Sequence, residues 1–149
     1  MFTLDANIFV RDVDIRDPHH STCHALLEAL HTRRTPLICP HILLPEVAGA
    51  VRRTWQDALR GRLAAQFVGE LPNLTLVAVD AALAQEAADL AADYALRGMD
   101  AIYVAVARRY GCTLVTLDDD PHRRAGTIVT VLTPADALAR IPAPPADTT

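Results

Sequence analysis

The sequence predicts an α/β fold built on one parallel β-sheet, and two observations lead to it. Five short runs of apolar and β-branched residues alternate with helical patterns along the chain, which is typical of parallel strands joined by helical crossovers. The length of 149 residues leaves room for a single domain. We expect the strands at residues 2–4, 36–39, 74–79, 113–117 and 128–132.

Helical patterns fill most of the chain between these strands. Between the first two strands, apolar residues recur at the spacing of a helix with one buried face, at Cys23, Leu26, Leu27 and Leu30. Further helices are expected at residues 44–53, 55–71, 82–94 and 100–110, and Gly111 should end the last of them. In the helix over 55–71, the same spacing places Leu59, Leu63 and Phe67 toward the core.

Composition limits the class of protein. Hydrophobic residues make up 51% and charged residues 21%, and no apolar run approaches the ~18 residues of a membrane span. The chain starts with a strand-like segment and shows no secretory signal, so we expect a soluble, cytoplasmic protein. The cysteines lack metal-ligand spacing and are expected to be buried as small hydrophobic residues: Cys23, Cys39 and Cys112.

Charge gives a mixed indication about nucleic acid as a partner. The net charge of −4 argues against a broad RNA-binding surface, but all 14 basic residues are arginine. Arginine binds phosphate as a two-pronged donor, so these residues are suitable phosphate contacts. The Pro/Ala-rich end of the chain is expected to be a disordered tail over residues 141–149, which leaves 1–140 as the folded domain.

Four acidic residues lie singly against apolar segments: Asp5, Glu46, Asp100 and Asp118. Asp5 and Asp118 follow predicted strands, and ligands bind at the carboxyl edge of such sheets. Glu46 and Asp100 lie in the first turns of helices that start at the same edge, where each alone could be an ordinary helix-favouring acid. Together the four predict a cluster, because buried carboxylates require neutralising cations.

The ligand type indicates which cation and which chemistry. Carboxylates without nearby histidine or cysteine favour Mg²⁺ or Mn²⁺ over Zn²⁺. Such ions activate water and stabilise the leaving oxygen in phosphodiester hydrolysis. His122, beside Arg123 and Arg124, lies where it can approach a phosphate near Asp118, but lone histidines seldom have such roles and we leave it outside the site.

Four segments of this chain resemble the PIN-domain family, specifically the VapC-type toxins of toxin-antitoxin pairs. They are Leu4-Asp5-Ala6-Asn7-Ile8-Phe9, Pro45-Glu46-Val47-Ala48, Asp100-Ala101-Ile102-Tyr103-Val104-Ala105-Val106-Ala107 and Leu114-Val115-Thr116-Leu117-Asp118. The resemblance covers about residues 2–132. It implies a three-layer α/β/α domain with a five-stranded parallel sheet in the order 3-2-1-4-5.

The resemblance also implies an activity, a site and partners. The activity is that of a Mg²⁺- or Mn²⁺-dependent ribonuclease, with the four acids as catalytic metal ligands and with Asn7 and Thr116 as polar supports. The partners are an RNA substrate, a second copy of the chain in a homodimer and a VapB-like antitoxin. We expect the antitoxin to place a basic side chain in the acidic crevice and an amphipathic helix in an apolar groove within residues 19–71.

Two questions stay open at this point: which of three consecutive aspartates is the fourth acid of the site, and whether one of two alternative functions applies. Among Asp118, Asp119 and Asp120 we favour Asp118, which ends the strand, and expect the other two in a solvated connection. A non-catalytic PIN-like module that binds RNA or protein is one alternative. A haloacid-dehalogenase-like phosphatase is another, although such enzymes carry Asp-x-Asp where this chain has Asp5-Ala6-Asn7.

Overall fold

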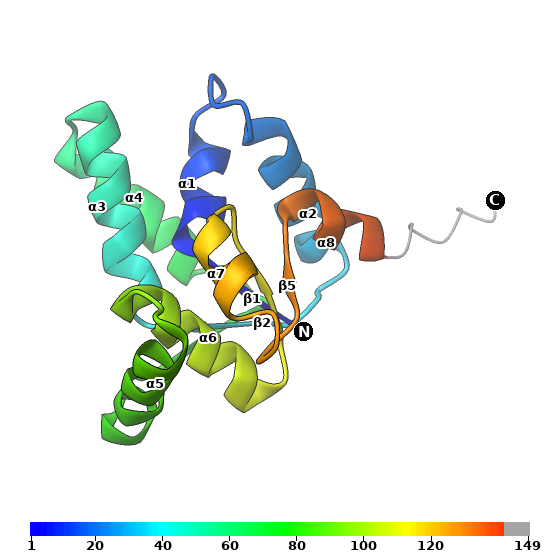
Figure 1. Ribbon diagram of the computed structural model, residues 1–149. Coiled ribbons are helices and arrows are strands. Elements are labelled where there is room, and N and C mark those ends of the chain that lie inside the picture. Colours follow the sequence, from blue (N-terminus) through cyan, green and yellow to red (C-terminus); the bar gives the residue numbers. More distant parts are fainter. Residues whose placement is uncertain (142–149) are drawn as a thin grey trace.

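The computed structural model describes residues 1–141 and shows a parallel five-stranded sheet between helices (Figure 1). Its strand order is β3-β2-β1-β4-β5, which confirms the predicted fold class. The strands are β1 (Phe2–Leu4), β2 (Leu37–Pro40), β3 (Leu74–Val77), β4 (Thr113–Val115) and β5 (Val131–Leu132). The predicted tail, apart from Ile141, lies outside the described residues.

The helices include three that the sequence analysis did not predict: α1, α7 and α8. The full set is α1 (Ala6–Val13), α2 (His20–Thr32), α3 (Leu43–Trp55), α4 (Ala58–Gly69), α5 (Ala81–Tyr94), α6 (Gly98–Tyr110), α7 (Asp119–Arg124) and α8 (Pro134–Arg140). The three missed helices are short, with 8, 6 and 7 residues. A helix of two turns shows little periodicity, and its existence depends on caps and tertiary packing.

Two apolar cores lie on opposite faces of the sheet. Consecutive residues of β4 belong to different cores, Leu114 to one and Val115 to the other, because side chains alternate across a strand. Buried residues of α1, α2, α3, α4 and α8 form the core around Val115, and those of α5 and α6 form the core around Leu114. The three layers that the resemblance implied are therefore present. The three cysteines are buried, as expected.

Several of the predicted strands were too long. β4 ends at Val115 instead of Leu117, and β5 begins at Val131 because residues 126–128 form a turn. The early end of β4 affects the candidate site, because Thr116 and Leu117 then belong to the loop that leads to Asp118. Gly111 has φ +63° at the end of α6, which confirms it as the stop of that helix.

The prediction for the buried face of α4 was wrong. Leu59, Leu63 and Phe67 are 58%, 54% and 68% exposed, whereas Gly61 and Val68 are buried. The reason is close contact with α3: a Cβ on Gly61 would lie 2.7 Å from the carbonyl oxygen of Ala48. The helix therefore packs through its smallest residue and leaves its larger apolar stripe on the surface.

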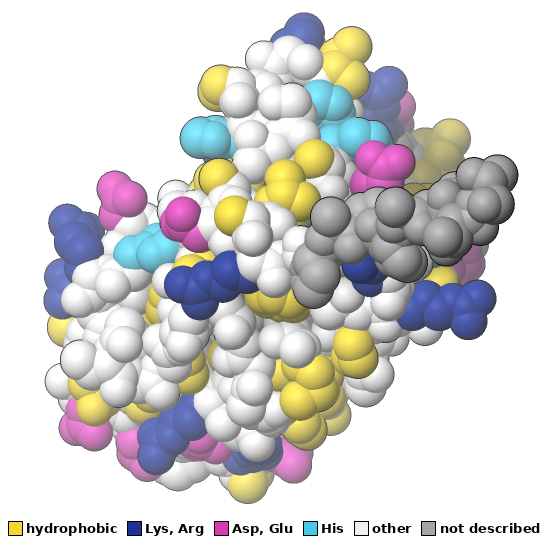
Figure 2. Space-filling view, turned by 90° about the vertical axis from the view of Figure 1, so that its right-hand side faces the viewer, with side chains coloured by type: hydrophobic (Ala, Val, Ile, Leu, Met, Phe, Trp, Pro, Cys, Tyr) yellow, Lys and Arg dark blue, Asp and Glu magenta, His cyan; other side chains and the backbone are white. Residues whose placement is uncertain are grey.

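Surface charge is mixed on the face that Figure 2 shows. Arginine and acidic side chains are interspersed there, with histidines near the top of the view. The net charge of −4 is thus not gathered into one negative field on this face. Among residues 1–141, none of the helices has both the length and the hydropathy that a membrane crossing requires.

Candidate active site

Three of the four predicted acids meet at the carboxyl edge of the sheet. Asp5 follows β1, and Asp118 follows β4, its neighbour, in which Val115 pairs with Leu4. Asp100 lies in the first turn of α6. One carboxylate oxygen from each of Asp5, Asp100 and Asp118 lies within 4.8 Å of the other two. We call these three residues the acidic cluster.

Hydrogen bonds from both expected polar supports fix the position of Asp5. Thr116 Oγ1 donates to Asp5 Oδ2 at 2.6 Å, and Asn7 Nδ2 donates to the same oxygen at 3.0 Å. The backbone N–H of Asn7 donates to Asp5 Oδ1 at 3.1 Å, so Asp5 also caps α1. Thr116 Oγ1 in turn accepts from the backbone N–H of Asp118 at 3.0 Å. One network therefore joins the loops after β1 and β4.

Glu46 lies in the same cleft but not in the acidic cluster. The cleft has a volume of about 620 Å³ and is lined by residues that include Asp5, Glu46 and Asp118. The Tyr103 hydroxyl donates to Glu46 Oε2 at 2.6 Å. Burial raises the pKa of Glu46, the Tyr103 hydrogen bond lowers it, and repulsion from Asp5 and Asp100 raises it further.

Tyr103 and His122 are two residues of this region that the sequence analysis did not assign to the site. Tyr103 follows Asp100 by three residues, so both lie on one face of α6. That spacing was the available signal for Tyr103. His122 Nε2 lies 3.1 Å from the carbonyl oxygen of Thr116. It therefore supports the loop that carries Asp118.

Asp100 is a buried carboxylate whose charged form is unfavourable in the metal-free cluster. It is 9% exposed, and within the described part of the chain its buried Oδ2 has no hydrogen-bond partner. Burial, followed by repulsion from Asp5 and Asp118, raises the pKa of Asp100 to about 6, against a partial opposing effect of Arg97. Burial also raises the pKa of Asp5. Closely spaced oxygen donors with an unpaired buried oxygen fit a hard divalent cation such as Mg²⁺ or Mn²⁺.

The raised pKa of Asp100 predicts a pH dependence of stability. Without metal, the unfolded chain releases the Asp100 proton near pH 3.8 and the folded chain releases it at about pH 6. The folded state binds more protons between these values, so the free energy of unfolding should fall as pH rises through this window. Urea unfolding of metal-free wild type and Asp100→Asn should give curves whose difference grows across the window. A constant difference would contradict the assignment.

The aspartates that follow Asp118 have distinct environments. Asp118 is exposed and precedes α7, and Asp119 and Asp120 lie in the first turn of that helix. The Asp120 side chain is 18% exposed and pairs with arginines, so the expectation of a solvated connection was wrong for Asp120. It holds for Asp119, which is exposed.

This geometry predicts that Asp118→Asn and Asp119→Asn behave differently. Asp118 contributes an oxygen to the acidic cluster and Asp119 does not. The ribonuclease activity that the resemblance implies should fall about tenfold or more in Asp118→Asn, by loss of one metal-binding charge, and should be nearly unchanged in Asp119→Asn. Initial cleavage rates at equal protein concentration measure both. A larger loss of cleavage in Asp119→Asn than in Asp118→Asn would show that Asp119, and not Asp118, is the acid of the cluster.

Comparison with protein-family models decides the family. The model of the PIN domain matches residues 2–127. The chain belongs to the PIN-domain family. A sequence search among curated proteins gave no match.

Solved structures of low sequence identity share this PIN-domain fold. VapBC2 from Rickettsia felis, bound to a promoter DNA fragment, is 17% identical with a TM-score of 0.67, over 89% of this chain and 97% of that one. VapC20 of Mycobacterium tuberculosis, a sarcin-ricin loop cleaving toxin, is 19% identical with a TM-score of 0.70, over 87% and 97%. A toxin-antitoxin complex from Klebsiella pneumoniae is 21% identical with a TM-score of 0.65, over 90% and 98%.

Proposed function

We propose that this PIN-domain protein is a Mg²⁺- or Mn²⁺-dependent ribonuclease that hydrolyses RNA phosphodiester bonds. The observation that carries the proposal is the acidic cluster, whose three carboxylate oxygens lie within 4.8 Å of one another. Family membership supports nuclease activity in general. The unpartnered Asp100 Oδ2 supports a cation in the cluster, because a buried carboxylate oxygen without a donor is unfavourable.

The side chains of the cleft have separate roles in this proposal. Asp5, Asp100 and Asp118 would hold the ion, which when bound supplies an activated water and stabilises the leaving oxygen. Thr116 keeps the Asp5 carboxylate in place through its 2.6 Å hydrogen bond. Tyr103 occupies Oε2 of Glu46, so Glu46 Oε1 remains to accept a proton from the attacking water. A raised pKa suits Glu46 to that transfer.

The environment of Asn7 disfavours the phosphatase alternative. A haloacid-dehalogenase-like enzyme would need an acid there to protonate the leaving group. Asn7 Nδ2 instead donates to Asp5 and to Thr116, and its Oδ1 accepts from the backbone N–H of Leu117 at 3.3 Å. The presence of all four acids disfavours the non-catalytic alternative.

One assay distinguishes the three functions. Purified protein is incubated with Mn²⁺ and either labelled single-stranded RNA or para-nitrophenyl phosphate. The ribonuclease proposal predicts RNA cleavage that EDTA abolishes, without release of para-nitrophenol. Phosphate release from the small substrate would favour the phosphatase, and RNA binding without cleavage would favour the non-catalytic module.

We further propose that the protein is the toxin of a toxin-antitoxin pair, acts on cytoplasmic RNA and forms a homodimer. Structures of similar fold include a toxin-antitoxin complex from Klebsiella pneumoniae and VapBC2 from Rickettsia felis, and this chain offers a surface that an antitoxin could cover. Light scattering of the isolated protein should give twice the chain mass of 16.2 kDa. A monomer would remove the dimer from the proposal and leave the nuclease unaffected.

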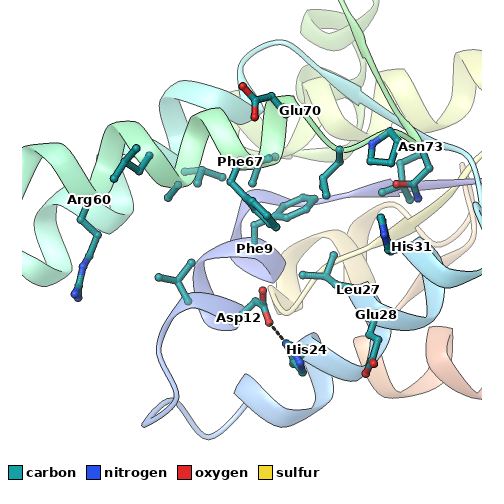
Figure 3. Close-up of a pocket in the computed structure, with 18 of the residues that line it drawn as sticks. Phe9, Asp12, His24, Leu27, Glu28, His31, Arg60, Phe67, Glu70 and Asn73 are labelled. Atoms are coloured by element: carbon teal, nitrogen blue, oxygen red, sulfur yellow. Dashed lines mark hydrogen bonds and ion pairs between the residues drawn. The ribbon is translucent and has the colours of Figure 1, made fainter.

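The candidate antitoxin surface is an apolar groove between α1, α2 and α4 (Figure 3). It has a volume of about 880 Å³. Phe67 and Phe9 lie close together in it, with Leu27 on the side of α2. The exposed residues Leu59 and Leu63 extend the groove along α4. The sequence analysis expected an antitoxin groove between the helices of residues 19–71, and α1 and residues 72–73 also line the groove described here.

The charges at the groove specify the partner's chemistry. Four acids line it, Asp12, Glu28, Asp57 and Glu70, with Arg60 as its one arginine. An amphipathic helix with an apolar stripe and flanking basic residues complements this surface. A basic side chain from the same partner would enter the acidic cluster and compete with the metal. The partner would thereby inhibit cleavage.

A further inference from the structure

Asp120 contacts three arginines from two segments of the chain. Arg123 Nη2 lies 2.8 Å and Arg124 Nε 3.4 Å from Asp120 Oδ1, and Arg97 Nε lies 3.9 Å from Asp120 Oδ2. The Asp120 side chain is 18% exposed, whereas the side chains of Arg97, Arg123 and Arg124 are 75%, 70% and 42% exposed. The carboxylate thus lies beneath guanidinium groups that face solvent. We call Arg97, Arg123 and Arg124 the arginine group.

The arginine group borders the acidic cluster. Arg97 is the N-cap of α6, three residues before Asp100, and Asp120 lies in α7, two residues after Asp118. The starts of α6 and α7 therefore meet twice, through the oxygens of Asp100 and Asp118 and through the Arg97–Asp120 contact. Figure 1 shows α7 near the centre of the view, next to α6. A substrate in the cluster would lie within reach of these arginines.

The arginine group differs from the other ion pairs of residues 1–141 in its number of arginines per carboxylate. Arg11 and Arg16 each pair with one aspartate, and Arg109 pairs with both Asp80 and Glu86. Asp120 alone is shared by three arginines, so this group carries two positive charges in excess. An excess of exposed arginine at the edge of a negative cleft is a feature that fold stability does not require, because exposed ion pairs contribute little.

We propose that Arg97, Arg123 and Arg124, anchored by Asp120, bind the backbone phosphates that flank the cleaved bond of the RNA. The inference rests on the proposed function and names the surface that takes its substrate. The acidic cluster repels every phosphate except the one a bound cation neutralises, so neighbouring phosphates need other cations. Arginine has five N–H donors in a fork that matches phosphate. Contacts of this kind raise affinity without selecting a sequence.

The test compares two triple variants that remove equal charge. Arg97→Ala/Arg123→Ala/Arg124→Ala removes the arginine group, and Arg16→Ala/Arg108→Ala/Arg109→Ala removes three arginines elsewhere. Fluorescence anisotropy measures the affinity for labelled single-stranded RNA in Ca²⁺, between about 50 and 200 mM salt. Loss of three phosphate contacts should weaken binding about 10- to 100-fold at the lower salt and reduce the log–log salt slope by about 2. The control triple should bind like wild type.

Two results would overturn the proposal. One is that Arg97→Ala/Arg123→Ala/Arg124→Ala, the site triple, binds RNA with the affinity and salt slope of wild type. The other is that Arg16→Ala/Arg108→Ala/Arg109→Ala, the control triple, loses as much RNA affinity as the site triple. Binding is read without cleavage, so a wild type that binds through these arginines but does not cut RNA would contradict the proposed function alone.

The role of Asp120 is tested through metal binding. Asp120→Asn should keep the full increase in melting temperature that Mn²⁺ gives wild type, because an anchor of arginines does not ligate the ion. Loss of that increase would make Asp120 a metal ligand and overturn its assignment as the anchor. The site triple should also keep the increase, which confirms that its fold and acidic cluster are intact.

Discussion

Asp100→Asn is expected to abolish RNA cleavage and to leave the fold intact. Asparagine keeps the shape of the side chain but removes a metal-binding charge from the acidic cluster, which should lower the cleavage rate at least about a hundredfold. In the metal-free protein near neutral pH the variant should be more stable than wild type. The gain is at most about 3 kcal/mol, the equivalent of the shift from 3.8 to about 6 in the pKa of Asp100.

Activity and structure are measured on the same preparations. Circular dichroism and urea unfolding report the fold and its stability, and the release of labelled RNA fragments in Mn²⁺ reports cleavage. Asp119→Asn is the matched control, because it makes the same chemical change outside the cluster. Cleavage by Asp100→Asn at the rate of wild type would show that Asp100 only favours the start of α6.

Phe67→Glu is expected to abolish inhibition by the proposed antitoxin without affecting cleavage. Phe67 is 68% exposed, so the substitution should change the free energy of unfolding by no more than about 0.5 kcal/mol. In the complex, however, the ring would be buried against an apolar partner helix. A charge there should weaken binding about 30-fold or more, in the range of an interface hot spot.

Co-expression with the proposed antitoxin, sought in the open reading frame upstream of the gene, provides the measurement. Wild type should co-purify with its product in a complex that does not cleave RNA, and Phe67→Glu should purify alone and active. Tyr110→Glu is the control, because Tyr110 is a 39% exposed aromatic residue that does not line the groove. A Phe67→Glu complex as tight and as inactive as that of wild type would contradict the groove assignment.

The sequence contained enough information for the sheet and for most of the acidic cluster. The strand-forming runs alternate with helical stretches, and this alternation alone indicates a parallel sheet whose carboxyl ends share an edge. Asp5 and Asp118 follow two such runs directly, and Asp100 starts a long helix. These three acids converge because each lies at a strand end or a helix start, and the sequence shows where those ends and starts are.

Other features depended on contacts between distant segments. The orientation of α4 is set by the contact of Gly61 with Ala48, which outweighs an apolar stripe that would otherwise be buried. Glu46, which lies outside the cluster, accepts a hydrogen bond from Tyr103, 57 residues away. The Arg97–Asp120 contact likewise joins two helix starts. No spacing in the sequence indicates which of these side chains will meet.

The melting temperature of the protein in millimolar Mn²⁺ tests most directly whether the acidic cluster is a metal centre. If the Mn²⁺ concentration is about a hundred times the dissociation constant, binding should stabilise wild type by about 2.7 kcal/mol, or about 5–10 °C. The double variant Asp5→Asn/Asp100→Asn should show little of this increase. No increase in wild type, or an equal increase in the double variant, would contradict a metal-dependent nuclease centred on these carboxylates.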